Sequence, residues 1–357
     1  MKHLELFAGI GGFRRALDLI GHDFNVSMDC IGFSEIDSNA MKTYYANFHP
    51  TDDEINIGDI VAFTSNEENI KALPDFDLLT GGFPCQTFSM MGKKLGFKDE
   101  DRGQMFFRIL DILSLKKPKY LLLENVKNLY SHDKGNTFKV VKSSLEQLGY
   151  TIYYDIFNSS DFHLAQNRNR VYILGIRGKQ KNSIDFSAKA IKVYFDEIYQ
   201  QTSVEKQNSV LDILEQNVSP IYTLSERIKP TILSDGSASF KSNSEINQDP
   251  ARPLTATMHK MHRACQDNYY SIGYIHSMGK ENPATKLSKE ELCRLEIRKL
   301  TPREAMLLQG FPETWSLNAY NSQVSNGALY KQAGNAVSVN VVYAILHYCI
   351  VKKIIKL

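Results

Sequence analysis

A glycine-rich turn between a short apolar run and a helical pattern is the feature that most restricts how this chain can fold. Residues 2–7 are typical of a strand, and the glycines of FAGIGG (7–12) follow directly. Residues 13–20 carry apolar side chains at helical spacing, and Gly21 is a natural end for that helix. Strand, glycine turn and helix begin a nucleotide-binding α/β unit, because glycine admits a ligand close to the backbone and the helix start offers free N–H groups. The sequence therefore predicts an α/β fold.

A carboxylate follows this turn at the distance expected for a ligand contact. Glu35 stands 24 positions after Gly11, close to the ~20 expected for a carboxylate that binds a ribose hydroxyl. The glycines run G-x-G-G and not G-x-G-x-x-G, which suits an adenosyl ligand with one carboxylate at least as well as a pyrophosphate. Asp59 closes a third candidate strand and is a candidate contact for an adenine amino group, although a Gly-Asp pair is usually only a turn.

The stretch GGFPCQTFS (81–89) places Cys85 just after a short apolar run that ends in two glycines and a proline. Ligands and chemistry in open α/β sheets lie outside the carboxyl ends of such strands. A lone cysteine is more often a small buried hydrophobe. Glycine, proline and glutamine neighbours are a poor environment for a core residue, so we interpret Cys85 as a nucleophile.

Glu124 follows the apolar run KYLLL (119–123), so a parallel sheet would bring it to the same edge as Cys85. A carboxyl group there is a candidate general acid with a raised pKa; the alternative is an ion-paired structural glutamate. Arg168 and Arg170 precede the strand-like residues 171–176 and should point the same way. Their side chains could bind a base edge or a phosphate, or they could equally be surface charges.

Composition restricts the class of protein. The formal net charge is +2, so a nucleic-acid partner must be held by local basic patches. The five cysteines form no Cys-x-x-Cys pair, which predicts a reducing cytoplasm and no metal site. Apolar runs are all shorter than the ~20 residues of a membrane span, so we expect no membrane association.

The remaining segments predict a discontinuous domain organisation. Residues 90–104 lack periodicity and suit a mobile lid, and residues 178–297 are polar and loop-rich with a basic tract near 252–263. The apolar helix 339–351 should pack on the N-terminal sheet. We therefore expect a catalytic, cofactor-binding domain at 1–195 plus 330–357, a second domain at 196–300, and a hinge at 301–329.

Together the motifs resemble, in family order, those of the bacterial cytosine-C5 DNA methyltransferases of restriction-modification type. The resemblance rests on FAGIGG (7–12), GGFPCQTFS (81–89), LLENV (122–126), QNRNR (166–170), RKLTPREAMLLQGFP (298–312) and QAGNAVSVNV (332–341). It implies a Rossmann-like, S-adenosylmethionine-dependent methyltransferase domain with a smaller, loop-rich target-recognition domain. It also implies methyl transfer to C5 of a flipped-out cytosine through a thiolate adduct at C6.

The resemblance assigns roles to residues of this chain. It gives catalysis to a thiol, a carboxyl group and two arginines: Cys85, Glu124, Arg168 and Arg170. Glu124, protonated, would hydrogen-bond the ring N3, Arg170 would hold O2, and Arg168 would lie beside the cysteine. The cofactor site would comprise the glycine loop and residues after later strands: Phe7, Ala8, Gly9, Ile10, Gly11, Gly12, Glu35, Ile36, Asp59, Ile60, Pro84 and Asn335. We expect DNA contacts from the lid and the second domain: Ser89, Met91, Lys93, Lys94, Arg102, Arg252, Thr255, Thr257, Lys260 and Arg263.

The implied partners are double-stranded DNA and a cognate restriction endonuclease that acts separately, with S-adenosylhomocysteine as the product. A monomer in the bacterial cytosol is expected. Three alternatives stay open: a transfer-RNA cytosine-C5 methyltransferase of the same fold, a nicotinamide-dependent oxidoreductase, and a catalytically silent DNA-binding regulator. The RNA branch typically carries a Cys-Phe-Thr signature, which this chain lacks.

Overall fold

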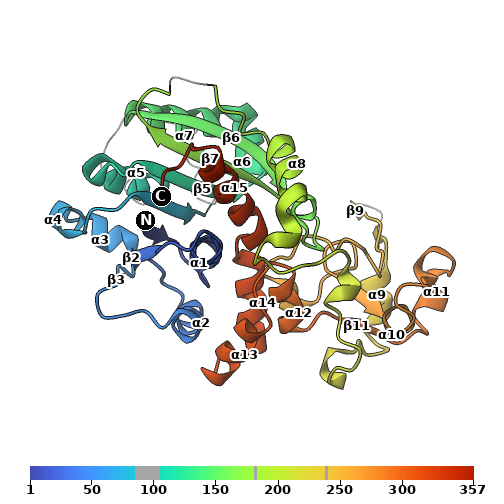
Figure 1. Cartoon of the computed structure of the whole chain (residues 1–357). Helices are drawn as coiled ribbons and strands as arrows, with labels where there is room; N and C mark the ends of the chain where they lie inside the picture. The colour runs from blue at the N-terminus through green and yellow to red at the C-terminus, as the bar shows by residue number, and fades with distance from the viewer. Residues whose placement is uncertain (85–104, 181–182, 238–239) are drawn as a thin grey trace. The chain divides into compact units, whose positions relative to one another are not determined.

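The computed structural model describes residues 1–84, 105–180, 183–237 and 240–357, which divide into two compact units (Figure 1). Unit 1 comprises Met1–Asn158, Asn169–Val204 and Val341–Leu357. Unit 2 comprises Ser159–Arg168 and Glu205–Asn340. Both units are therefore built from segments that are far apart in the sequence.

A seven-stranded sheet with the order β3-β2-β1-β4-β5-β7-β6 forms the centre of unit 1. The strands are β1 (Lys2–Leu6), β2 (Asp29–Phe33), β3 (Ile55–Asn56), β4 (Leu78–Gly82), β5 (Tyr120–Val126), β6 (Tyr150–Asn158) and β7 (Asn169–Arg177). The first five strands pair in parallel, whereas β7 is antiparallel to both β5 and β6. The predicted α/β fold is confirmed.

The strand order reverses between β1 and β4, and in such sheets the crevice at the reversal point is the usual ligand site. Leu6 of β1 pairs with Gly81 of β4, and Gly82 pairs with Glu124 of β5. The glycine turn, the segment after β4 and Glu124 therefore share the carboxyl edge of the sheet. A Cβ on Gly81 would lie 3.2 Å from the carbonyl oxygen of Leu6, so a small residue suits this close strand pairing.

Helices cover both faces of the sheet. One face packs in a single core cluster against side chains of α3 (Ile60–Thr64), α4 (Glu67–Ala72), α5 (Met105–Lys116), α6 (Asn128–Ser131) and α7 (Asn136–Gln147). The other helices of unit 1 are α1 (Gly12–Phe24), α2 (Ser38–Phe48), α8 (Ala188–Ile198) and most of α15 (Val339–Val351). Tyr343 of α15 donates a 2.6 Å hydrogen bond to Asp23 of α1, and Tyr194 of α8 lies 2.7 Å from His347. The apolar helix at 339–351 thus contacts α1 and α8 within unit 1, and its expected packing on the N-terminal sheet stays a prediction.

Unit 2 contains many short elements. Its helices are α9 (Lys229–Leu233), α10 (Ile272–His276), α11 (Lys289–Leu292), α12 (Pro302–Leu307), α13 (Thr314–Asn321) and α14 (Asn326–Asn335). Its strands are β8 (Gly236–Ser237), β9 (Phe240–Lys241), β10 (Tyr269–Ser271) and β11 (Ile297–Lys299), which form two-stranded sheets. Thr301 caps α12 through a capping box with Glu304, and Pro302 occupies the first helical position.

The boundaries of the units differ from those expected from the sequence. Residues 301–329, expected as a hinge, lie inside unit 2, because Glu304 of α12 forms a fully buried ion pair with Arg298. Residues 159–168 also belong to unit 2, because Gln166 and Arg168 hydrogen-bond to its backbone. The assignment of cofactor binding and target recognition to the two units stays a prediction.

The helix α8 lies where polar texture predicted little regular structure, and the side chain of Ser187 caps its start. Among the described residues, Asn326–Val351 is long and apolar enough to cross a membrane by length and composition. However, 72% of its most apolar window is buried inside the protein, which is the burial of a core segment.

Candidate active site

The candidate catalytic carboxylate lies at the carboxyl edge of the unit 1 sheet. Glu124 pairs in register with Gly82, the last residue of β4. Only Phe83 and Pro84 separate Gly82 from Cys85 in the chain. Cys85 itself, and the lid predicted at 90–104, lie outside the described residues.

Asn125 fixes the backbone that leads to Cys85. Its side-chain amide donates a 2.7 Å hydrogen bond to the carbonyl oxygen of Phe83, and the Asn125 side chain is buried. The Phe83 ring is buried as well and lies 5.4 Å from the ring of Phe106 in the core. Sequence reasoning gave Asn125 no role, although an amide directly after Glu124 in LLENV was a signal for it.

Arg170 holds the carboxylate of Glu124. The guanidinium Nε lies 3.0 Å from Oε1 of Glu124, and both side chains are largely buried. Val126 pairs with Arg170 across β5 and β7, so Arg170 and Glu124 are diagonal neighbours on one face of the sheet. Two of the predicted catalytic residues therefore lie in contact. The protonated state expected for Glu124 stays a prediction.

Arg168 has different partners from Arg170. It lies before β7, is buried, and donates hydrogen bonds to the carbonyl oxygens of Leu254, Gly334 and Ala336 at 3.0, 3.1 and 2.9 Å. These partners all belong to unit 2, so Arg168 joins its segments 254 and 334–336. The place beside Cys85 that the resemblance implies for Arg168 stays a prediction.

The glycine turn after β1 is held by Glu35. The N–H of Gly9 donates to Oε2 of Glu35 at 2.8 Å, while the N–H groups of Ile36 and Asp37 donate to Oε1 at 2.8 and 2.7 Å. A carboxylate offers about four lone-pair sites, so one acceptor position of Glu35 stays available to a ligand hydroxyl. Gly11 has φ +82°, and a Cβ there would lie 2.0 Å from the ring of Phe48.

The other candidate cofactor residues have varied environments. Gly9 has φ +56° and open space where a Cβ would point, and the side chain of Ile36 is 75% exposed, which is unusual for isoleucine. Phe7 packs partly on the core, while Ala8, Ile10, Gly12 and Ile60 are buried. Asp59 is exposed and caps α3 by accepting the N–H of Val61 at 2.8 Å. Pro84 is exposed after β4, and Asn335 is exposed at the last residue of α14 in unit 2.

Glu5 of β1 lies buried beneath the glycine turn, and sequence reasoning missed it. Its Oε1 accepts the N–H of Arg14 at 3.3 Å near the start of α1, and Tyr44 donates to Oε2 at 3.4 Å. Burial raises the pKa of Glu5 to about 8, so this group is mostly protonated at neutral pH. A glutamate inside the apolar strand directly before the turn was the available signal.

The candidate DNA-contacting residues divide between described and undescribed segments. Those of the lid, Ser89, Met91, Lys93, Lys94 and Arg102, lie outside the described residues. In unit 2, Arg252, Thr255 and Thr257 line one cavity of about 310 Å³ together with His262. Lys260 is exposed and Arg263 half-buried. The structure therefore brings three of the expected contacts together around one cavity.

The backbone around Thr255 lies very close to α14. A Cβ on Gly334 would lie 2.2 Å from the carbonyl carbon of Thr255 and 2.3 Å from the nitrogen of Ala256. The carbonyl oxygens of Leu254 and Gly334 are also the acceptors of Arg168. The candidate DNA-contacting tract is thus fixed to the segment that carries Asn335.

Comparisons with known proteins agree with this geometry. Residues 1–351 match the family model described as C-5 cytosine-specific DNA methylase. The chain is 39% identical to the Type II methyltransferase M1.ScrFI of Lactococcus lactis subsp. cremoris, over 96% of this chain and 76% of that protein. It is 37% identical to the Type II methyltransferase M.HaeII of Haemophilus aegyptius, over 96% of this chain and 91% of that protein.

Solved structures support the fold. The crystal structure of the S. pombe Dnmt2 methyltransferase superimposes with a TM-score of 0.74 at 21% identity, covering 99% of both chains. At this identity the likeness shows the architecture alone. The family match over nearly the whole length carries the functional conclusion: the chain belongs to the C-5 cytosine-specific DNA methylases and is a DNA (cytosine-5)-methyltransferase.

Proposed function

We propose that Cys85 is the nucleophile and that methyl transfer proceeds through a covalent bond between its sulfur and C6 of the target cytosine. Addition of the thiolate makes C5 electron-rich, so that C5 can take up a methyl group. Loss of the C5 proton and elimination of the thiolate then restore the aromatic ring. A thiolate suits both steps, because it is a strong nucleophile and a good leaving group.

The observation that supports this proposal most strongly is the contact between Glu124 and Arg170. It lies at the carboxyl edge of the sheet, where β4 ends three residues before Cys85. The 3.0 Å ion pair fixes the carboxyl group at the end of β5, and Asn125 anchors the Phe83 carbonyl nearby. In our proposal, Glu124 binds N3 of the ring and Arg170 binds O2. Both contacts would stabilise negative charge that develops on the ring after thiolate addition.

We propose S-adenosylmethionine as the methyl donor, bound at the reversal point between β1 and β4. When bound, it supplies an electrophilic methyl group. The residues present fit such a ligand, because the open space at Gly9 admits a close approach to the backbone and the exposed Ile36 offers an apolar surface to an adenine. Glu35 would accept a ribose hydroxyl through its remaining acceptor position, and Asp59 would receive the adenine amino group.

The substrate is proposed to be duplex DNA from which the cytosine is flipped out, since C5 and C6 cannot be reached inside the stacked helix. The Type II names of the relatives support a role in protecting host DNA beside a separate restriction endonuclease in the bacterial cytosol. The transfer-RNA alternative would use the same chemistry at Cys85. The family match disfavours the nicotinamide-dependent alternative.

The test is methyl transfer by the wild-type chain and by Cys85→Ser, with plasmid DNA and with transfer RNA as separate substrates. We expect radiolabelled methyl groups in DNA only, and none with Cys85→Ser, while the variant still binds DNA. Cys30→Ser is the matched control, because Cys30 lies in β2 and should not affect the rate. Full activity of Cys85→Ser would exclude the covalent mechanism. Methylation of transfer RNA alone would show that RNA, and not DNA, is the substrate.

A further inference from the structure

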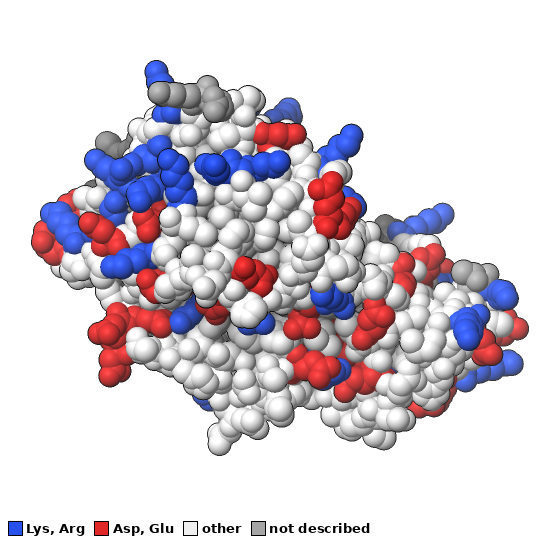
Figure 2. Space-filling model, viewed as in Figure 1, with Lys and Arg blue, Asp and Glu red and all other residues white. Residues whose placement is uncertain are grey.

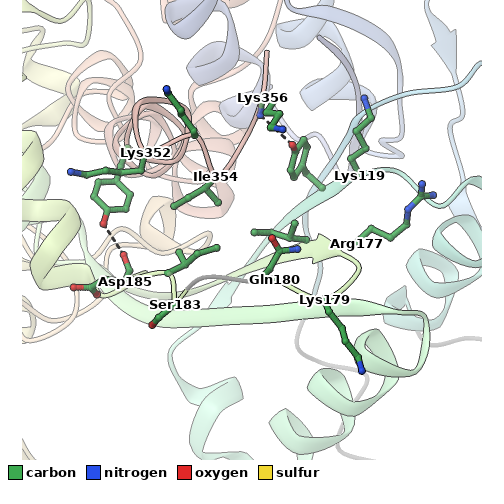
Figure 3. A pocket seen from close by; sticks show the side chains of 14 residues that line it. Lys119, Arg177, Lys179, Gln180, Ser183, Asp185, Lys352, Ile354 and Lys356 are labelled. Carbon is green, nitrogen blue, oxygen red and sulfur yellow. Dashed lines mark hydrogen bonds between the residues drawn. The ribbon is translucent and has the colours of Figure 1, made fainter.

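A basic cavity lies in unit 1 at the edge of the sheet opposite to the candidate active site. It measures about 850 Å³ and lies between the start of β5, the end of β7 and the segment that follows α15 (Figure 3). Tyr120 lines the cavity at the first residue of β5, and Glu124 lies about 13 Å further along the strand. The cavity is therefore separate from the catalytic edge.

Positive side chains dominate its lining. The lining cations are Lys119, Arg177, Lys179, Lys352, Lys353 and Lys356. Against these six cations stand the lining carboxylate Asp185 and Asp77, which pairs with Lys119 at 2.9 Å. The local excess of four positive charges exceeds the formal net charge of the whole chain, which is +2. Figure 2 shows Lys and Arg side chains gathered over this side of unit 1.

Several of these cations are available to a ligand. Among the residues that the structure describes, Lys179, Lys352 and Lys356 form no ion pair within 4.0 Å. All three side chains are exposed. They come from two segments on different sides of the cavity, the turn after β7 and the segment after α15 (Figure 3). Holding like charges together without counter-charges is unfavourable, and a bound polyanion would relieve the repulsion.

The cavity offers charge but no surface for stacking a base. Its tyrosines, Tyr120 and Tyr348, are buried, and their hydroxyl groups already have partners. The Tyr120 hydroxyl accepts the N–H of Lys356 at 3.2 Å, and the Tyr348 hydroxyl donates to the carbonyl oxygen of Asp185 at 2.9 Å. A ligand recognised through charge alone is a phosphate chain and not a nucleotide that is read through its base.

We propose that this cavity binds the phosphodiester backbone of a second duplex DNA segment, without reading its sequence. The protein would then hold one segment at the catalytic edge and another at the opposite edge, which favours transfer between neighbouring DNA segments. Sequence-independent affinity of this kind comes from counterion release around phosphates that meet Lys and Arg. The inference goes beyond the catalytic proposal and is independent of the chemistry of Cys85.

The test is capture of a second duplex by protein already bound to an immobilised one. The full-length chain is loaded on a biotinylated mixed-sequence duplex, and a fluorescent duplex is then added at rising salt. The test variant combines Lys179→Glu, Lys352→Glu and Lys356→Glu. The matched control combines Lys42→Glu, Lys134→Glu and Lys139→Glu, three exposed lysines that do not line the cavity.

We expect wild type and control to capture the second duplex and the triple variant to lose about tenfold or more of this capture. The slope of log affinity against log salt should fall by about three for the second duplex and stay unchanged for the first. A milder variant with alanine at the same three positions should change capture in the same direction. Unchanged methylation of a short duplex by the triple variant checks that it is folded.

Equal capture by wild type and the triple variant would overturn the proposal, because bridging would then come from another surface or from association of two chains. Absence of capture by the wild type would overturn it too. Displacement of the second duplex by inorganic tripolyphosphate at equal phosphate concentration would assign the cavity to a small anion. Capture of single-stranded RNA in preference to duplex DNA would replace the proposed ligand.

Discussion

Unit 1 and unit 2 reach ordered structures by different physical means. Unit 1 is organised by a continuous strand ladder over an apolar core, and its polar site residues lie on the edge of that sheet. Unit 2 has short elements joined by buried polar groups. Arg298 and Glu304 form an ion pair with both side chains fully buried, and the ammonium of Lys229 donates to the carbonyl oxygens of Cys293 and Leu295 at 3.2 and 2.6 Å.

The two units should therefore respond differently to substitution. Substitution of a carboxylate at the edge of the sheet should cost little folding stability, because the backbone hydrogen bonds between the strands do not depend on its side chain. A buried charged group that joins loops costs several kcal/mol if its partner is removed. Substitutions in unit 1 at the sheet edge should therefore act on catalysis, and those at the polar anchors of unit 2 should act on stability.

The largest expected effect is on catalysis in unit 1. Glu124→Gln keeps the shape of the side chain but removes the carboxyl group that we propose to bind N3 of the ring, so the rate of methyl transfer should fall by about 10²–10⁴-fold. The midpoint of urea unfolding should change less than in the unit 2 variants, because the amide oxygen of glutamine can still accept a hydrogen bond from Arg170. Single-turnover transfer at saturating DNA and cofactor measures the rate. Glu146→Gln, a half-exposed glutamate of α7, is the control, and an unchanged rate for Glu124→Gln would remove that residue from the mechanism.

The next effect should appear in unit 2. Glu304→Ala leaves Arg298 buried without its carboxylate, and the free energy of unfolding should fall by about 3–5 kcal/mol. The single tryptophan, Trp315, lies buried in α13, so its fluorescence follows the urea unfolding of this unit. Arg303→Ala removes a more exposed ion pair with Glu313 and should cost about 1 kcal/mol or less. Similar losses for both variants would contradict the role of the buried pair.

A smaller effect separates two glycines of one helix. Gly334→Ala places a methyl group against the backbone of Thr255 and Ala256, and strain of this kind typically costs about 1–3 kcal/mol. Gly327→Ala meets no atom within 4 Å, and it should be neutral or stabilise by about 0.5–1 kcal/mol. Trp315 fluorescence in urea measures both. If Gly334→Ala proved as harmless as Gly327→Ala, the close approach of these segments would be wrong.

An effect of similar size is a pH dependence of the stability of unit 1. Burial raises the pKa of Glu5 from its ordinary value of 4.5 to about 8, so the native state keeps a proton that the unfolded chain releases. Stability therefore falls as pH rises between these values. Burial lowers the pKa of His3 from 6.5 to about 3, which gives the opposite slope, but only below pH 6.5.

Between pH 6.5 and 8, the loss from Glu5 should be on the order of 2 kcal/mol, and Glu5→Gln should abolish it. Far-UV circular dichroism in urea at the two pH values measures the difference. Parallel slopes for wild type and variant would show that Glu5 does not titrate in this range.

The sequence predicted unit 1 better than unit 2 for a physical reason. Apolar runs that end in glycine or a carboxylate identify strands and their edge, so Glu35 and Glu124 could be placed from spacing alone. A buried arginine looks like a surface arginine in a sequence, so the anchoring of Arg168 and Arg298 could not be foreseen. The ion pair of Glu124 with Arg170 depends on the antiparallel register of β5 and β7, which no local pattern specifies.

We propose that Cys85, which follows the strand edge of unit 1, forms the bond to the cytosine ring. Duplex DNA with 5-fluorocytosine in place of cytosine tests this directly. A base removes the C5 hydrogen of cytosine as a proton, but it cannot remove fluorine as a positive ion, so the thiolate is not eliminated and the covalent bond persists. Incubation with S-adenosylmethionine should give a denaturation-resistant complex, and mass spectrometry should find the modified pyrimidine on the Cys85 peptide. If the enzyme methylates ordinary DNA yet forms no such complex, or forms it through another residue, Cys85 is not the nucleophile.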